Sequence, residues 1–331
     1  MDRAAAAALA HDRAPDSAVR PQADADAFIH WLLASVEVET SVFHVGQYCG
    51  TWHASTAGRA LASYHLVLRG ECFVHLEGRA PIALGPRDAV FFLRDVPHFL
   101  SADASGAPPL VGAAMEPLSQ EVLGSVGLAC GFFHFRGALS RLLADGLPDH
   151  VILRAGTEEL ASTRALFELI LAEGGRDPSA PSPLVARLAD LLFFYVLRHV
   201  VKTDASASGL WSLVRNPQLA SLVEAVLKDP AKSWTVESMA KSCGMSRASF
   251  FKHFEQASGT SPGQFLLLVR MRVAARRLAA GDSAIEAAEQ VGYQSLAAFS
   301  RAFKKVIGQQ PSAYRRALSC PAAATESITD F

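Results

Sequence analysis

The sequence has few cysteines and no long apolar run. Only 5 of its 331 residues are cysteines, they are widely spaced, and none belongs to a Cys-x-x-Cys pair. This usage argues against a disulfide framework and a structural zinc site, and it is typical of reduced thiols in the cytoplasm. No stretch reaches the ~18 uncharged apolar residues that a membrane-spanning helix requires. The alanine-rich N-terminus is interrupted by charges and lacks the pattern of a secretory signal. We therefore expect a cytoplasmic protein without a membrane span.

Catalytic motifs are missing as well. The chain has no G-x-S-x-G, no phosphate-binding glycine-rich loop, and no Cys/His pair at a recognisable spacing. An enzyme therefore has little support in the sequence. With 50% hydrophobic and 19% charged residues, the chain can fill ordinary hydrophobic cores, and its length predicts about two domains.

The net charge of −1 conceals a strong asymmetry between the two halves of the chain. Residues 212–318 hold 15 Lys and Arg against 7 Asp and Glu, a surplus of 8 positive charges, so the remainder carries −9. A basic module of about a hundred residues beside an acidic one predicts an anionic partner for the C-terminal part, with nucleic acid as the leading candidate.

The first half of the chain is typical of a β domain. Residues 1–26 are of low complexity and are predicted to form a disordered tail. Between residues 43 and 100, short runs alternate large apolar side chains with others, as in residues 72–76, and turn signals such as Arg69-Gly70 separate them. Short strands at this spacing predict an antiparallel sandwich or barrel.

Helical periodicity begins near residue 157. Thr157 can cap a helix that extends to about Glu173, and a second helix is expected over residues 184–201. The second helix is apolar on nearly every side, which indicates burial in a core or against another subunit. We expect it to leave Leu188, Leu192, Tyr195 or their neighbours for a partner copy. The small polar residues 202–209 begin a predicted linker that extends to residue 211.

Two segments of the basic half have the spacing of a helix-turn-helix unit. In the first, Ala240 and Gly244 are four residues apart, Ser246 can cap the next helix, and Phe250 and Phe254 recur one helical turn apart. A small alanine allows two helices to approach closely, and glycine adopts the positive φ of the turn.

The second segment has the same plan, with Ala288, Gly292, Ser295, Phe299 and Phe303. One helix, over residues 262–280, joins the two segments. Such a pair of units can place two helices in successive segments of the DNA major groove.

These residues resemble the DNA-binding domain of the AraC/XylS family of transcription regulators. The resemblance covers residues 216–316, and its most specific part is Gly292-Tyr293 followed by FSRAFKK (299–305), Gly308, Pro311-Ser312 and Tyr314-Arg315. The N-terminal segments YHLVLRGE (64–71), LGPRDAV (84–90) and CGFFHF (130–135) are similar to the cupin-like barrel of one AraC subgroup. Together the resemblance spans most of residues 27–316.

The resemblance implies which residues contact DNA. The second helix of each unit, called here its reading helix, supplies them. In the first reading helix they are Arg247, Ala248, Phe251 and Lys252, and in the second they are Ser295, Leu296, Ala297, Ser300, Arg301 and Lys304. Arg and Lys can donate to guanine edges or phosphates, whereas Ala, Leu and Phe can contact only thymine methyl groups or fill space. Because Leu296 and Ala297 stand where many relatives have longer polar residues, we expect the second helix to contact few base edges.

The histidines of the barrel region suggest a metal site but do not complete one. Metal-binding cupins use a His-x-His pair, a Glu and a later His, but here Ser63 replaces the first His and Glu71 is one residue out of place. His65 and His98 match, and two ligands of four are too few for a stable site. We therefore expect no metal, and assign Tyr64, His65 and His98 to a small-molecule pocket.

The sequence thus predicts an α+β protein in two domains. A cupin-like antiparallel barrel with connecting helices is expected over 27–201, the linker over 202–211, an all-α module with two helix-turn-helices over 212–318, and a tail over 319–331. The predicted function is that of a sequence-specific DNA-binding transcription regulator. Its expected partners are double-stranded promoter DNA, a small-molecule effector, a second copy of the chain and, for an activator, RNA polymerase. No cofactor is expected. The alternatives are a metal-dependent cupin enzyme with an accessory basic domain, and an architectural DNA-binding protein without ligand control.

Overall fold

The computed structural model describes residues 20–105, 116–118, 124–176, 182–203 and 207–319. Most of the two predicted tails, and Cys320, lie outside the described residues. Helix α1 (Arg20–Ser35) begins within the segment that was predicted to be a tail. Its C-terminal half is apolar, and Phe28, Ile29 and Leu32 are buried in the main core.

Two antiparallel sheets form the N-terminal domain, as the alternating runs predict. A six-stranded sheet has the order β10-β6-β3-β9-β1-β8, and a four-stranded sheet has the order β2-β7-β4-β5. The strands of the first sheet are β1 (Val38–Tyr48), β3 (Ala62–Arg69), β6 (Ala89–Phe92), β8 (Glu116–Pro117), β9 (Val126–Phe135) and β10 (His150–Leu153). Those of the second are β2 (His53–Ala54), β4 (Cys72–Leu76), β5 (Ile82–Leu84) and β7 (His98–Ser101).

Strand β3 shows how the sheet separates two cores, because successive side chains point to opposite faces. Tyr64 and Leu66 belong to the main core, which extends under the helices. Val67 belongs to a second apolar cluster, together with Val74 and Leu100 of the smaller sheet. The interior between the two sheets is therefore filled with side chains around this cluster.

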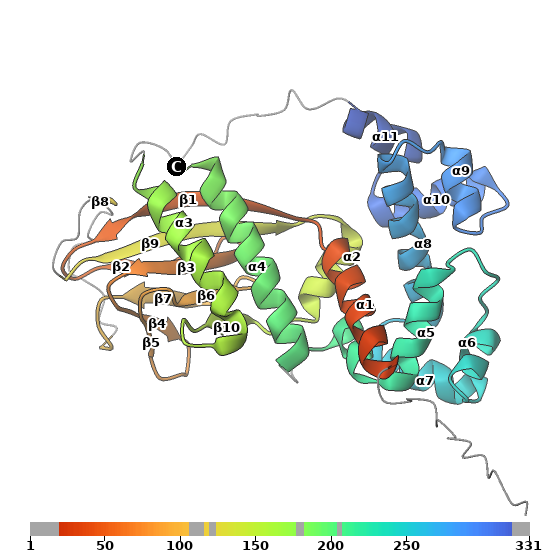
Figure 1. The fold of residues 1–331 in the computed structure, drawn as a ribbon, viewed down its shortest axis with the longest axis horizontal. Coiled ribbons are helices and arrows are strands. Elements are labelled where there is room, and N and C mark those ends of the chain that lie inside the picture. Colours follow the sequence, from red (N-terminus) through yellow and green to blue (C-terminus); the bar gives the residue numbers. More distant parts are fainter. Residues whose placement is uncertain (1–19, 106–115, 119–123, 177–181, 204–206, 320–331) are drawn as a thin grey trace, which may run out of the picture.

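Helices α3 (Arg164–Gly174) and α4 (Pro183–Thr203) lie on the outer face of the larger sheet (Figure 1). Phe193 of α4 packs on Phe133 of β9, with ring centroids 4.5 Å apart. The helix predicted to begin after Thr157 begins instead as a 3-10 turn, Glu158–Thr163, and becomes α-helical only at Arg164. Thr157 makes no side-chain cap bond there, so its predicted capping role was wrong.

The predicted linker is only partly a linker. Helix α4 extends to Thr203, and the 3-10 segment Gly209–Arg215 contributes Leu210, Trp211 and Leu213 to the main core. Trp211 is fully buried, and its indole N–H donates to the carbonyl oxygen of Leu143, at the end of α2 (Gly137–Asp145), at 2.7 Å. The polar composition concealed this anchor because the buried residues, Leu210 and Trp211 among them, follow the polar run directly.

The C-terminal domain is helical throughout its described residues. Its helices are α5 (Pro217–Lys228), α6 (Val236–Ser242), α7 (Arg247–Ser258), α8 (Pro262–Ala279), α9 (Ala284–Gln290), α10 (Leu296–Ile307) and α11 (Pro311–Ser319). Helices α6 and α7 form one helix-turn-helix unit, α9 and α10 form the other, and α8 runs between them (Figure 1). The sequence predicted both units.

Local signals specify the two units. The turn glycines Gly244 and Gly292 have φ of +64° and +78°, in the left-handed region that glycine adopts without a steric penalty. The four phenylalanines of the repeated pattern are fully buried, and they are Phe250, Phe254, Phe299 and Phe303. Both predictions from glycine and phenylalanine spacing are therefore confirmed.

Candidate nucleic-acid interface

The two candidate reading helices, α7 and α10, begin and end in the same way. The Ser246 hydroxyl accepts a hydrogen bond from the backbone N–H of Ser249 at 3.2 Å, and Ser295 accepts one from Ala298 at 3.3 Å. These N-caps satisfy backbone donors that would otherwise lack partners in the first turn. A left-handed glycine ends each helix, Gly259 after α7 and Gly308 after α10.

The predicted contact residues of α7 lie at its surface. Arg247, Ala248 and Lys252 are exposed, and Phe251 is 39% exposed beside its buried neighbour Phe250. Arg247 Nε lies 2.9 Å from Glu237 Oε1 of α6, in an ion pair with both side chains largely in solvent. Because such pairs contribute at most about 1 kcal/mol, a phosphate can compete for this guanidinium.

The predicted contact residues of α10 are similarly placed. Ser295, Leu296, Ala297, Arg301 and Lys304 are exposed, whereas Ser300 is half-buried. Leu296 is 44% exposed. The α10 surface therefore offers Arg301 and Lys304 as cations, together with a small apolar area at its N-terminal end.

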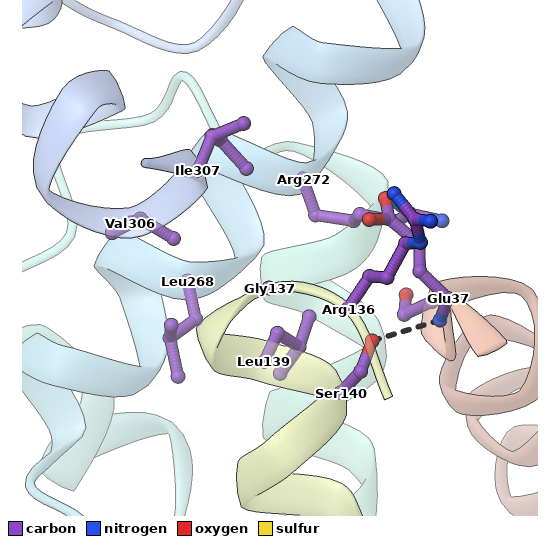
Figure 2. Close-up of a pocket in the computed structure, with 10 residues that line it drawn as sticks. Glu37, Arg136, Gly137, Leu139, Ser140, Leu268, Arg272, Val306 and Ile307 are labelled. Carbon is purple, nitrogen blue, oxygen red and sulfur yellow. Dashed lines mark hydrogen bonds and ion pairs between the residues drawn. The ribbon is translucent and has the colours of Figure 1, made fainter. Parts of the chain in front are cut away.

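Figure 2 shows a contact between the N-terminal and C-terminal domains that involves none of the predicted DNA-contact residues. Arg272 of α8 forms an ion pair with Glu37, and its Nη2 donates to the carbonyl oxygen of Ala34 at 2.8 Å. The backbone N–H of Glu37 in turn donates to the hydroxyl of Ser140 on α2 at 2.8 Å. Burial lowers the pKa of Arg272.

Apolar side chains surround this ion pair. Leu139 of α2, Leu268 of α8, and Val306 and Ile307 at the end of α10 line a cavity of about 20 Å³ (Figure 2). Such a volume accommodates no more than a water molecule. The second helix-turn-helix unit is therefore packed directly on α2 of the N-terminal domain, a contact that the sequence did not predict.

The two candidate pocket histidines meet between the sheets. The Nε2 atoms of His65 and His98 are 3.3 Å apart, and the Thr56 hydroxyl oxygen lies 3.2 Å and 3.1 Å from them. His98 Nδ1 lies 2.6 Å from the carbonyl oxygen of Val96, and His65 Nδ1 lies 3.1 Å from the Cys130 thiol. Thr56 and Cys130 are members of this cluster that the sequence did not identify.

Burial controls the protonation of this cluster. It lowers the pKa of His65 to about 3, with the nearby His98 acting in the same direction, and it also lowers the pKa of His98. Both imidazoles are therefore neutral at pH 7. Each can then donate through one nitrogen and accept through the other.

Tyr64 does not join the two histidines. It follows Ser63 on β3 and points to the opposite face from His65, where its hydroxyl donates to the carbonyl oxygen of Ser41 at 3.1 Å. The alternation of a strand requires this separation, so Tyr64 belongs to the core beneath α4. In the described part of the chain, no group of three or more His, Cys, Asp or Glu side chains could hold a metal ion.

Two further observations bear on the class of protein. Within the described ranges, no helix is both long and apolar enough to cross a membrane. Family models match both domains: a cupin model matches residues 28–202, and a helix-turn-helix domain model matches residues 239–317.

The chain is similar to several helix-turn-helix transcription regulators, and to two of them over most of its length. An AraC-like transcription regulator of Streptomyces antibioticus is 30% identical over 275 residues, which cover 81% of this chain and 91% of the relative. An HTH-type transcriptional regulator of Haemophilus influenzae is 28% identical, covering 82% and 93%. The RCS-specific HTH-type transcriptional activator RclR of Escherichia coli is 32% identical, covering 40% and 47%. The chain has a cupin domain followed by two helix-turn-helix units, and its relatives are transcription regulators. It therefore belongs to the AraC family of DNA-binding transcription regulators.

Proposed function

We propose that the chain is an effector-controlled activator that acts as a homodimer on promoter DNA in the cytoplasm. The observation that carries this proposal is the pair of equivalent capped helices, α7 and α10. All of their predicted contact residues except Ser300 are exposed, and the N-terminal domain contacts α10 near its C-terminal end, at Val306 and Ile307. In this arrangement DNA can reach both helices without first displacing the other domain.

The contact residues have different roles in this proposal. Arg247, Lys252 and Arg301 carry donors that suit guanine edges or phosphates, and Lys304 suits a phosphate. Ala248, Phe251, Leu296 and Ala297 offer apolar contact to thymine methyl groups, and the hydroxyls of Ser295 and Ser300 can bond to either bases or phosphates. Sequence selection then depends mainly on the arginines.

The sensing part of the proposal is supported by the His65–His98–Thr56 cluster. Its polar atoms converge within 3.3 Å of one another inside an apolar surround. A small molecule with a hydrogen-bonding group would compete for these atoms, and its entry would have to displace side chains that fill the space between the sheets. An effector would therefore alter the packing of the sensor domain.

The dimer is proposed to form through α4, where the expected residues Leu188 and Tyr195 are partly exposed but Leu192 is not. Leu192 is fully buried, so it cannot reach a partner, whereas Leu184 and Leu191 are 55% and 46% exposed. Beside Leu191, a groove of about 410 Å³ separates α4 from the end of α1. Leu191 lines this groove and Leu184 is exposed two turns earlier on the same helix, and together they support this surface as the dimer contact.

The assignment as an activator is supported by the similarity to RclR, which is a transcriptional activator, and an activator would also contact RNA polymerase. The test begins with duplexes recovered from a random-sequence pool by the full-length chain. A template that carries the recovered site upstream of a promoter should then give more transcript with purified RNA polymerase when the chain is added. An unchanged or reduced transcript level would reject the activator assignment, and failure to enrich any sequence would reject specific DNA recognition.

A further inference from the structure

Arg270 of α8 contacts both helix-turn-helix units. Its Nε donates to the carbonyl oxygen of Pro230 at 2.9 Å, and its Nη2 donates to that of Lys232 at 3.0 Å. On the other side, its guanidinium carbon lies 5.9 Å from the ring centroid of Tyr293. Pro230 and Lys232 belong to the loop that leads into α6, and Tyr293 belongs to the turn that leads into α10.

The two units also touch through their backbones at this point. A Cβ atom placed on Gly292 would lie 2.4 Å from the carbonyl oxygen of Ala231, closer than real Cβ atoms come. Gly244, the equivalent turn glycine of the first unit, has a similar positive φ but no atom within 4 Å of such a Cβ. Gly292 is therefore required both by its positive φ and by the close approach of Ala231, whereas Gly244 is required only by its positive φ.

Both ends of this contact are fixed by further bonds. In the loop, Lys232 donates its backbone N–H to Asp229 Oδ1 at 3.1 Å, and the Trp234 indole donates to the Asp229 carbonyl at 2.9 Å. Thr235 then caps α6. In the turn, the Tyr293 ring packs edge-on against Phe299 of α10 at 5.7 Å. A displacement at Arg270 would thus move whole helices.

We propose that Arg270 is a positioning residue that fixes the separation and relative orientation of α7 and α10. The chain would thereby select DNA by the spacing between the two groove segments as well as by their bases. This inference rests on the proposed function in one respect, namely that both helices contact DNA. Arginine suits the role because its planar group can hold two carbonyl oxygens and lie over an aromatic ring at once.

The test uses the full-length chain and the duplex that it recovers from a random-sequence pool. Footprinting first locates the two segments of that duplex that the bound chain protects from cleavage. The duplex is then resynthesised with one base pair inserted or deleted between these segments, which changes their separation by about 3.4 Å and their relative rotation by about 35°. Wild-type protein should lose about tenfold in affinity on either altered duplex, the scale of one mismatched base pair.

The informative variants are R270A and G292A. In both, affinity for the original duplex should fall, and the difference between the original and altered duplexes should shrink to within about threefold. G244A is the matched control, because it introduces the same side chain at a left-handed glycine without the clash, and it should keep the wild-type preference. R270K retains the positive charge but not the planar guanidinium group, so it should lose the spacing preference as R270A does. If circular dichroism shows that R270A is unfolded, R270K replaces it in the experiment.

The outcomes separate the inference from the proposed function. A wild-type preference retained by folded R270K and by G292A would overturn the positioning role, and so would a wild-type chain that is indifferent to spacing. A wild-type footprint over only one groove segment would instead show that the two helices do not both read DNA, which would reject the inference together with the proposed contacts of the second helix.

Discussion

Arg272 and Glu37 form an ion pair across the boundary between the two domains, although 235 positions separate them in the sequence. Arg272 lies two residues from Arg270 on α8, so its side chain projects from a different side of that helix. One arginine thus connects α8 to the sensor domain and the other connects the two helix-turn-helix units. Helix α8 therefore contacts both the N-terminal domain and the two helix-turn-helix units.

The first prediction concerns the stability of this boundary. Arg272→Ala should lower the free energy of unfolding by about 1–3 kcal/mol, because it leaves Glu37 without its cation and the Ala34 carbonyl without a donor. Chemical denaturation of the full-length chain measures the effect. Arg276→Ala, which removes an exposed arginine of the same helix, should change stability by no more than about 0.5 kcal/mol. Equal effects of the two substitutions would show that the ion pair contributes nothing.

The sequence could predict the helix-turn-helix units because their determinants are local. Gly244 and Phe250 lie six residues apart, and their spacing alone specifies a turn and a buried helix face. The ion pair of Arg272 and Glu37 has no such signature, since charges distant in the sequence carry no periodic pattern. Likewise, a helix that is apolar on nearly every side gives no indication that Leu192 is buried and Leu191 exposed. That distinction arises only from packing on the sheet.

A second prediction separates base contacts from phosphate contacts on α10. Arg301→Ala should weaken binding to the recovered duplex by about 1–3 kcal/mol, with a smaller loss on random DNA. Lys304→Ala should weaken binding to both about equally and reduce the slope of log K against log[salt] by about 1. Titrations at several salt concentrations provide both quantities. If Arg301→Ala lowers affinity equally for the two duplexes, Arg301 contacts only phosphate.

A third prediction concerns the pH dependence of stability. In the folded chain the pKa of His65 is lowered from 6.5 to about 3, and burial also lowers that of His98. Between these values the unfolded chain binds protons that the folded chain does not. Stability should therefore decrease as the pH falls from about 6.5 toward 3, by about 1.4 kcal/mol per pH unit for each fully coupled proton.

Denaturation midpoints at a series of pH values test this expectation. The His65→Gln variant retains a polar side chain at this position, and its stability should decrease less steeply on acidification than that of the wild type. His30→Gln, on the exposed side of α1, serves as the matched control and should follow the wild-type curve. A His65→Gln curve parallel to that of the wild type would show that this histidine does not limit stability in acid.

The last prediction uses two adjacent leucines of α4 to locate the proposed dimer surface. Leu191 is 46% exposed beside the groove, whereas Leu192 is fully buried under the sheet. Leu191→Glu should give a folded monomer by sedimentation, because a carboxylate in a subunit contact loses its hydration without gaining a partner. Leu192→Glu should fail to fold, since the same charge would enter the core. A folded Leu191→Glu variant that still sediments as a dimer would place the subunit contact outside this face of α4.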